Sequence, residues 1–250
     1  MLLAKLPRFI YRQTSVRCLS GVSPFYIVNE YPKSGGTWLS KMLSSALDVA
    51  DGRYYPIPFV PSVTQGHYLK SWGMKNVVVL WRDGRDVMVS WYHYCAFKNG
   101  LGNSLVVDTV RRDLGERDYE NVKEHLSDFI QYAFSKQKHP NFSWSDFVRA
   151  WYDKPGVIYV KYEDLKDNCA KEIQRLSYEF TGKKISDSRA EEIEEIFSFE
   201  RMSGRRPGQE AKNNFLRKGV VGDWKRYFDE KSCSLFEKYA GPELRLLGYE

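Results

Sequence analysis

The stretch FYIVNEYPKSGGTWLS, residues 25–40, decides how this chain is expected to fold. It begins with an apolar run, passes through a lysine and two adjacent glycines, and continues into a segment whose apolar residues have helical spacing. A turn between a strand and a helix collects backbone N–H groups and the positive end of the helix around an anion. We therefore predict a phosphate-binding loop within residues 31–40. A glycine-containing turn with an exposed lysine is the alternative that this stretch leaves open by itself.

The order of residues in this loop differs from the Walker A sequence G-x-x-x-x-G-K-[ST], in which the lysine follows the last glycine. Here Lys33 comes before both glycines, so it approaches an anion from the strand side. Ser34 and Thr37 add hydroxyl groups to the successive amides at the helix start. The loop thus favours phosphate binding without specifying the reaction.

Two further strand-like runs, residues 77–81 and 157–162, predict alternation of strands and helices along the chain. Helical patterning follows the strands, for example over residues 37–47 and 165–180. Parallel strands need helical crossovers that cover both faces of the sheet. We expect an α/β fold with three α/β/α layers, a central, mostly parallel sheet, and ligands at the carboxyl ends of its strands.

A second anion-binding candidate is WRDGRDVMVS, residues 81–90. Arg82 stands at a strand end, where open α/β sheets bind ligands, and Ser90 lies on a helix that is expected to begin near Gly84. Arginine is permanently charged and binds phosphate in a bidentate manner, and a serine hydroxyl adds a donor. An ion pair with a neighbouring aspartate is an equally good interpretation for Arg85 and a less favoured one for Arg82, which stands at the strand end.

The third candidate is FLRKGVVGDWKRYF, residues 215–228. Arg217 and Lys218 place two cations beside Gly219, a residue that readily adopts positive φ, and this combination suits a phosphate nest. A cationic surface turn is the alternative. Three separate candidates predict a ligand with more than one phosphate-like group.

Composition narrows the class of protein. At 250 residues and 42% hydrophobic content the chain can bury a substantial core, and no Pro/Gly/Ser-rich linker divides it. The longest apolar run, residues 77–81, is far shorter than the roughly 20 residues that span a bilayer, so no integral membrane segment is expected. The four cysteines lack metal-ligand or redox spacing, which argues against structural zinc and suits reduced thiols in a cytoplasmic compartment.

The formal charge of +6 is concentrated at the N-terminus. Four Lys and Arg residues precede the first acid, Glu30, so residues 30–250 carry only +2, too little for a nucleic-acid-binding surface. We expect residues 1–22 to form a loosely packed basic tail, with an organellar transit peptide as the alternative. A single domain is expected over residues 23–250, with a polar helical excursion at about 99–140 that is either a lid or a solvated insertion.

Taken together, the three stretches resemble the soluble sulfotransferases that depend on 3′-phosphoadenosine 5′-phosphosulfate (PAPS). YPKSGGTW is similar to the 5′-phosphosulfate loop of that family, WRDGRDVMVS to its 3′-phosphate strand-turn-helix, and RKGVVGDWK to its RKGxxGDWK signature. VKYEDL and FSFERM, residues 160–165 and 197–202, fall where the family has adenine-side elements. The resemblance keeps the family's order and covers most of the chain, from about residue 31 to 228.

The resemblance implies a set of donor-binding residues. The 5′ side and the adenine would be held by Lys33, Ser34, Gly35, Gly36, Thr37 and Trp38. The 3′-phosphate would be held by Arg82, Ser90, Arg217, Lys218 and Gly219, and the adenine bordered by Tyr162 and Phe199. Gly36 departs from the family, many of whose members have a hydroxyl residue there. One side-chain donor is lost, although we expect the backbone amide to remain.

A catalytic histidine is implied between the first loop and Arg82, and His67 is the only histidine in that interval. An imidazole with a pKa near 6.5 suits a general base. His93 is expected to pack or cap locally, whereas His125 and His139 belong to the excursion.

The implied reaction is direct in-line transfer of a sulfonate group from PAPS to a hydroxyl of a small-molecule acceptor, with an amine as the less favoured acceptor. His67 would remove the acceptor proton, Lys33 would stabilise the departing phosphate, and 3′-phosphoadenosine 5′-phosphate (PAP) would be released without a metal. A small-molecule kinase with a phosphate loop and a nucleotide-binding module without turnover are the rival functions. The sequence leaves the acceptor and a homodimer open.

Overall fold

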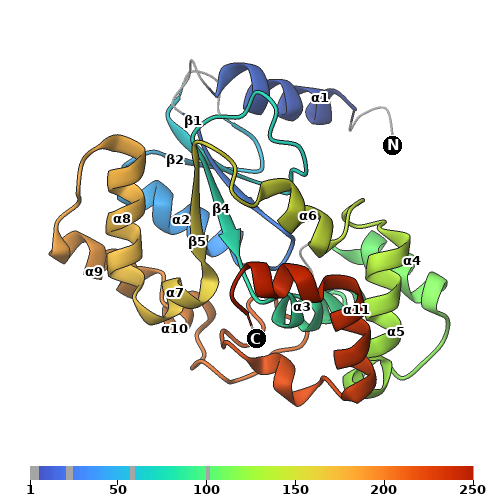
Figure 1. The fold of residues 1–250 in the computed structure, drawn as a ribbon. Coiled ribbons are helices and arrows are strands. Elements are labelled where there is room, and N and C mark those ends of the chain that lie inside the picture. The colour runs from blue at the N-terminus through green and yellow to red at the C-terminus, as the bar shows by residue number, and fades with distance from the viewer. Residues whose placement is uncertain (1–5, 21–24, 57–59, 100–101, 250) are drawn as a thin grey trace. The chain divides into compact units, whose positions relative to one another are not determined.

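A computed structural model describes residues 6–20, 25–56, 60–99 and 102–249 (Figure 1). Their contacts form two compact units. The first unit comprises residues 1–81 and 150–198, and the second unit comprises residues 82–149 and 199–250. The single domain expected from residue 23 stays a prediction, and its expected start lies outside the described residues.

The elements of the first unit are the strands of one sheet and the helices around it. The strands are β1 Phe25–Glu30, β2 Ala50–Arg53, β3 Ser62–Gly66, β4 Val77–Trp81 and β5 Val157–Lys161. The helices are α1 Leu6–Thr14, the π-helix η1 Ser15–Leu19, α2 Gly36–Ala46, α7 Tyr162–Asp167, α8 Cys169–Thr181 and α9 Asp187–Ile196.

In the residues that the structure describes, the secondary structure of the second unit is helical. They are α3 Gly84–Ala96, α4 Ser104–Leu114, α5 Val122–Lys136, α10 Phe199–Ser203, the 3-10 helix η2 Asp223–Arg226 and α11 Glu230–Leu246. Helix α6, Trp144–Trp151, contains the residues at which the chain passes from the second unit back to the first.

All strand pairs of the sheet are parallel, and their order is β2-β3-β1-β4-β5. The chain therefore places β3 on one side of β1 and β4 on the other. Open α/β sheets bind ligands outside the carboxyl ends of the strands, at such a reversal of strand order. The predicted α/β fold with a central parallel sheet is confirmed, and β1 is the strand that leads into the predicted phosphate loop.

The expected strand at residues 77–81 is confirmed without a change of boundary, because β4 is an uninterrupted apolar run. Strand β3 was not predicted, since its sequence SVTQG is mostly polar. All five of its residues are nevertheless buried, because β3 lies between β2 and β1. The helix expected over residues 165–180 is two helices, α7 and α8, which meet at Asn168.

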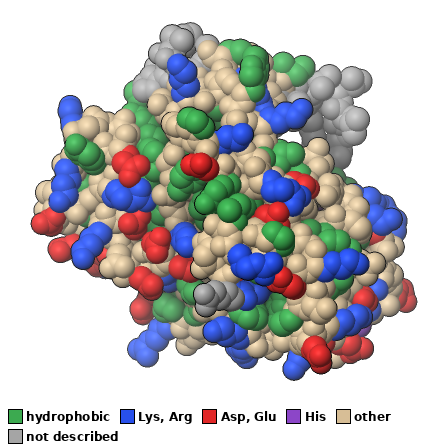
Figure 2. Space-filling view, in the orientation of Figure 1, with side chains coloured by type: hydrophobic (Ala, Val, Ile, Leu, Met, Phe, Trp, Pro, Cys, Tyr) green, Lys and Arg blue, Asp and Glu red, His purple; other side chains and the backbone are tan. Residues whose placement is uncertain are grey.

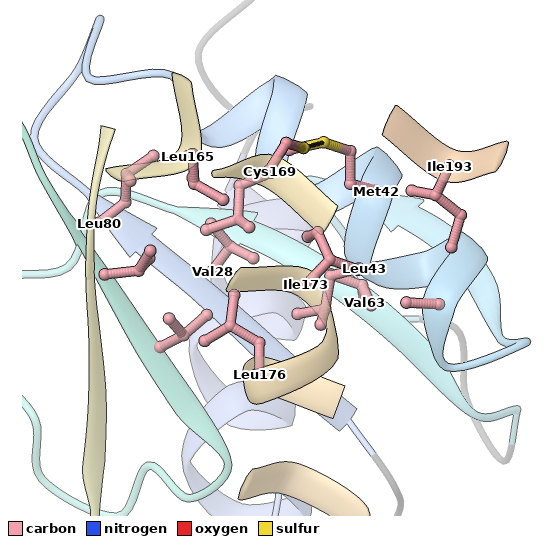
Figure 3. Close-up of a cluster of buried hydrophobic side chains, with 14 of the residues drawn as sticks. Val28, Met42, Leu43, Val63, Leu80, Leu165, Cys169, Ile173, Leu176 and Ile193 are labelled. Carbon is pink, nitrogen blue, oxygen red and sulfur yellow. Dashed lines mark hydrogen bonds between the residues drawn. The ribbon is translucent and has the colours of Figure 1, made fainter. Parts of the chain in front are cut away.

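The hydrophobic core of the first unit lies between the sheet and the helices α2, α8 and α9 (Figure 3). Leu43 of α2 and Ile173 of α8 lie in one cluster with Val28 and Val63 of the sheet. Full burial of one such side chain stabilises the fold by about 1.5–3 kcal/mol. This packing fixes α2, and with it the loop at its N-terminus, against β1.

The N-terminal segment is more closely packed than the sequence led us to expect. Residues 6–19 are helical, and both Val16 and Ser20 have no exposed surface. The Tyr11 hydroxyl donates to the Pro56 carbonyl at 2.6 Å, and the Ser20 hydroxyl donates to the Gly73 carbonyl at 3.3 Å. The expectation of a loose tail is therefore wrong for residues 6–20, because these contacts attach the segment to the first unit.

The polar excursion forms α4 and α5 of the second unit. Helix α5 packs against α3 and α11 and buries Leu126, Phe129 and Ile130. The interpretation as a merely solvated insertion is wrong for α5, because its apolar face belongs to a core. A role as a lid stays a prediction.

Acidic and basic side chains are interspersed over the face that Figure 2 shows. Within the described ranges, no helix has the length and apolar character needed to cross a membrane.

Candidate active site

The predicted phosphate loop joins β1 to α2 and contains two residues with positive φ, Lys33 at 74° and Gly35 at 112°. A Cβ atom on Gly35 would lie 2.8 Å from the Tyr162 ring, so the ring packs directly on the loop. Glycine satisfies both constraints at this position, since it tolerates positive φ and lacks a side chain. The tight turn points the N-terminus of α2 toward the carboxyl edge of the sheet.

The remaining side chains of the loop are held by specific contacts. Ser34 is buried, and the Thr37 hydroxyl donates to the Gln65 side-chain carbonyl at 3.0 Å. The indole N–H of Trp38 donates to the Phe197 carbonyl at 2.7 Å, and its ring meets Tyr162 edge-on at 5.7 Å between centroids. The structure thus brings the predicted residues 33–38 and Tyr162 together in the first unit.

Glu30, the last residue of β1, is a loop contact that the sequence did not reveal. Glu30 is 2% exposed, and its carboxylate accepts hydrogen bonds from the Gly36 backbone N–H and from the Gln65 side-chain amide, the latter at 2.6 Å. The Gly36 amide, which we expected to remain for the donor, is therefore already bound within the protein. An acid at the end of a buried strand was the available signal, because such a carboxylate needs a partner.

His67 follows β3, and the strand register brings it to the loop. Gly66 pairs with Asn29, so the next residues along the two strand directions, His67 and Glu30, lie side by side. Nδ1 of His67 is 3.0 Å from the Glu30 backbone carbonyl. A carbonyl only accepts, so Nδ1 carries the proton and the lone pair lies on Nε2.

The backbone next to His67 is fixed by the Asn29 side chain. Asn29 accepts from the Tyr68 N–H at 2.8 Å and donates to the Tyr68 carbonyl at 3.0 Å. The Trp151 indole donates to the same carbonyl at 2.6 Å. Because the backbone beside it is held in this way, the His67 imidazole keeps its position when it exchanges a proton.

The pKa of His67 is lowered to about 4, chiefly by burial. The hydrogen bond to the Glu30 carbonyl raises this pKa, whereas the positive charges of Arg12 and Lys33 lower it further. The imidazole is consequently neutral at neutral pH, the form that accepts a proton.

Arg12 of α1 was not expected near this site. Its Nε donates to the Tyr68 hydroxyl at 2.7 Å, and its guanidinium lies 4.9 Å from the centre of the Tyr68 ring. A second nitrogen donates to the Gln65 backbone carbonyl at 3.4 Å. The N-terminal segment therefore supplies a cation to the surroundings of His67.

In the second unit, the Asp83 side chain caps the N-terminus of α3 and accepts a hydrogen bond from the Arg85 backbone N–H at 2.8 Å. Arg85 also forms an ion pair with Asp83 at 2.8 Å, so its structural interpretation is confirmed. Arg82 donates to the Val220 carbonyl at 3.4 Å, and Ser90 lies further along α3, half-buried. The strand-turn-helix motif is thus adjacent to the C-terminal signature.

Asp86, a second residue that we did not predict, joins these motifs. Its carboxylate accepts from the backbone N–H groups of Gly222 and Trp224 at 2.7 and 2.9 Å. Hydrogen bonds from two backbone amides to one carboxylate fix the segment 217–224 on α3.

The cations of the signature are held by acids. Asp223 pairs with Lys218 and, at 2.6 Å, with Arg217, which also pairs with Glu210. Burial favours a raised pKa for Asp223, but these hydrogen bonds from Lys218 and Arg217 bring its pKa below the usual value. The two cations are therefore pre-oriented by a carboxylate that stays ionised.

Gly219 has a φ of 66°, and a Cβ atom on it would lie 2.3 Å from the Phe199 ring. The second unit thus gathers the predicted residues Phe199, Arg217, Lys218 and Gly219, with Arg82 at Val220.

His93 is 3% exposed and contacts the rings of Phe97 and Tyr227, with centroid distances of 5.7 and 5.9 Å. Burial, followed by the charge of Arg217, lowers its pKa. The expectation that His93 packs locally is confirmed. In the part of the chain that the structure describes, no three His, Cys, Asp or Glu side chains form a group that could hold a metal ion.

The family model described as "Sulfotransferase domain" matches residues 71–248. The chain belongs to the sulfotransferase family. This sulfotransferase is 26% identical to sulfotransferase 1E1 of Bos taurus, over 85% of this chain and 80% of that protein. It is 24% identical to the amine sulfotransferase of Oryctolagus cuniculus, over 86% of this chain and 79% of that protein.

A solved structure supports the same fold. Mouse sulfotransferase SULT7A1 complexed with PAP has a TM-score of 0.69 at 20% identity, with 94% of this chain and 90% of that chain covered. The family and enzyme class that the three motifs predicted, a PAPS-dependent sulfotransferase, are confirmed.

Proposed function

We propose that this sulfotransferase transfers the sulfonate group of PAPS directly to a hydroxyl of a small-molecule acceptor, with His67 as the general base. The observation that carries the proposal is the hydrogen bond of His67 Nδ1 to the Glu30 carbonyl, beside the loop that contains Lys33. It leaves Nε2 as the proton acceptor, and the lowered pKa keeps that nitrogen unprotonated at neutral pH.

In this mechanism the acceptor proton moves to Nε2 of His67 while the acceptor oxygen forms a bond to sulfur. The bond between sulfur and the bridging phosphate oxygen breaks, and its electron pair stays with PAP. Charge develops on the departing phosphate, where the Lys33 ammonium stabilises it. Neither a covalent enzyme intermediate nor a metal takes part.

The donor-binding roles divide between the two groups of residues. Ser34, Gly35 and Thr37 would bind the 5′ side of PAPS, and Trp38 and Tyr162 the adenine. Phe199 would also border the adenine. The 3′-phosphate would be bound by Arg82, Ser90, Arg217, Lys218 and Gly219. The ion pairs of Arg217 and Lys218 with Asp223 support this role, because they place both cations in one cluster.

Removal of one such cation tests the donor. We expect Arg217→Ala to weaken PAP binding about 10- to 100-fold, as befits the loss of a charge-assisted hydrogen bond. Adenosine 5′-phosphate lacks the 3′-phosphate, so its affinity should fall less than about threefold. Such a change is too small to indicate the loss of a hydrogen bond. Isothermal calorimetry with both nucleotides measures the two losses.

Arg206→Ala is the matched control, because Arg206 is an exposed arginine of the same unit. It should leave both affinities unchanged. If Arg217→Ala loses affinity equally for both nucleotides, or if the wild type binds both equally well, the 3′-phosphate assignment is wrong.

The pH profile tests the base. A base whose pKa is about 4 keeps kcat/KM on its plateau well below pH 6.5. A neighbouring cation disfavours the imidazolium, so Arg12→Ala should raise the pKa of His67 and move the acidic limb to higher pH. Lys75→Ala, which removes an exposed cation, should leave the limb in place. A limb that stays fixed in Arg12→Ala would contradict the assignment of that limb to His67.

A further inference from the structure

The Glu30 side chain fills the space that a side chain at position 36, the start of α2, would need. A Cβ atom on Gly36 would lie 2.5 Å from both Cδ and Oε1 of Glu30. Glu30 cannot easily yield, because it is buried and its carboxylate binds the Gly36 N–H and the Gln65 amide. The glycine that departs from the family therefore accompanies an acid on the neighbouring strand.

The carboxylate also determines which way the Thr37 hydroxyl points. An ionised carboxylate only accepts hydrogen bonds, so the Gln65 NH₂ group faces Glu30 at 2.6 Å. The Gln65 carbonyl is then turned to Thr37 and accepts the hydroxyl proton at 3.0 Å. One buried carboxylate thus engages two donors of the loop: the Gly36 amide directly and the Thr37 hydroxyl through Gln65.

A helix N-terminus is attractive to an anion because its first amides point outward and the helix dipole is positive there. Glu30 supplies such an anion from within the chain. Its negative charge also opposes that of Lys33 for any phosphate that approaches the loop.

We propose that Glu30 is an internal competitor of the donor: its carboxylate occupies the Gly36 amide and withdraws the Thr37 hydroxyl, and so weakens the hold of the loop on PAP. The inference rests on the proposed function, since PAP is the ligand. Its consequence is faster product release, a step that limits turnover in many enzymes.

Removal of the carboxylate should therefore tighten binding. We expect Glu30→Gln, which keeps the size and loses the charge, to lower the Kd for PAP at least about fivefold. The dissociation rate constant of PAP should fall in proportion. Calorimetry gives the Kd, and stopped-flow displacement of PAP gives the rate constant. A merely structural role predicts the opposite sign, because disruption of the loop weakens binding.

Glu243→Gln is the matched control, since Glu243 is also buried but pairs with Arg149 in the second unit. It should not change the Kd. Unchanged or weaker PAP binding in Glu30→Gln would overturn the inference, while the wild-type affinity for PAP separately tests the proposed function. Wild-type protein without affinity for PAP would overturn both.

A second measurement holds even if one variant folds poorly. Gly36→Ser should lower the melting temperature in the wild-type background, because the new Cβ meets the carboxylate. In Glu30→Ala the same substitution should cost much less, so the two changes are coupled in a double-mutant cycle. Additive changes in melting temperature would show that Glu30 does not fill this space. Gly241→Ser is the control, since its new Cβ would meet Glu237, whose side chain is 53% exposed and can turn away.

Discussion

His67→Ala should reduce the single-turnover rate of sulfonate transfer on the order of 10²- to 10⁴-fold, the usual contribution of a general base. PAP affinity should stay within about threefold of wild type, because a base acts on the acceptor and makes no charge-assisted bond to the nucleotide. Rapid-quench measurements with labelled PAPS separate this chemical step from slow product release. Calorimetry with PAP provides the affinity.

His125→Ala is the control for this experiment. His125 lies on α5 in the second unit and is half-buried, so its removal should change neither rate nor affinity. A folded His67→Ala protein that retains the wild-type single-turnover rate from about pH 6 to 9 would rule out His67 as the base, since a neutral imidazole is the reactive form there.

Lys33→Met should impair binding and chemistry together. The substitution keeps much of the side-chain length and removes the charge beside the loop. We expect a single-turnover rate lower by about 10²- to 10³-fold, comparable to the loss of one group that stabilises developing charge. PAP should bind about 10-fold more weakly, because the product phosphate also loses a charge-assisted contact.

Lys33→Arg should recover part of the affinity, since it restores the charge with a different shape. Lys41→Met is the control, because Lys41 is a half-exposed lysine of α2 that lies outside the loop. A Lys33→Met variant that loses affinity and keeps its single-turnover rate would confine Lys33 to binding. That result would leave the departing phosphate without its proposed cation.

The contrast between the two variants is informative on its own. His67 has a neutral imidazole and its Nδ1 is committed to the Glu30 carbonyl, so its loss leaves the charge of the loop unchanged. Lys33 contributes a charge that acts before and during the reaction. Opposite outcomes, with PAP affinity lost in His67→Ala and kept in Lys33→Met, would contradict both assignments.

Features that depend on contiguous residues could be predicted from the order of the amino acids alone. A lysine, two glycines and a threonine after an apolar run specify a strand, a turn and a helix start, because glycine permits positive φ and α2 has its apolar residues on one face. Strand β4 was predictable for the same local reason, since its five residues are all apolar. The order of the three motifs was sufficient to predict the family.

Tertiary structure decided the contacts that join distant residues. Strand β3 is buried by its neighbours rather than by its own composition, and only its pairing with β1 brings His67 to the loop. Gln65 of β3 reaches both Glu30, at the end of β1, and Thr37 of α2. These bonds depend on strand register and side-chain direction, which single-sequence patterns do not specify.

The same distinction explains the N-terminal segment and the C-terminal signature. Arg12 has no local pattern that indicates Tyr68 as its partner, 56 residues away. Asp86 binds backbone amides of residues 136 and 138 positions later in the chain. The sequence determined which residues carry charge and where the backbone turns, whereas burial and the packing of separate segments decided which charges pair and which histidine stays neutral, since desolvation and pairing exist only in the folded chain.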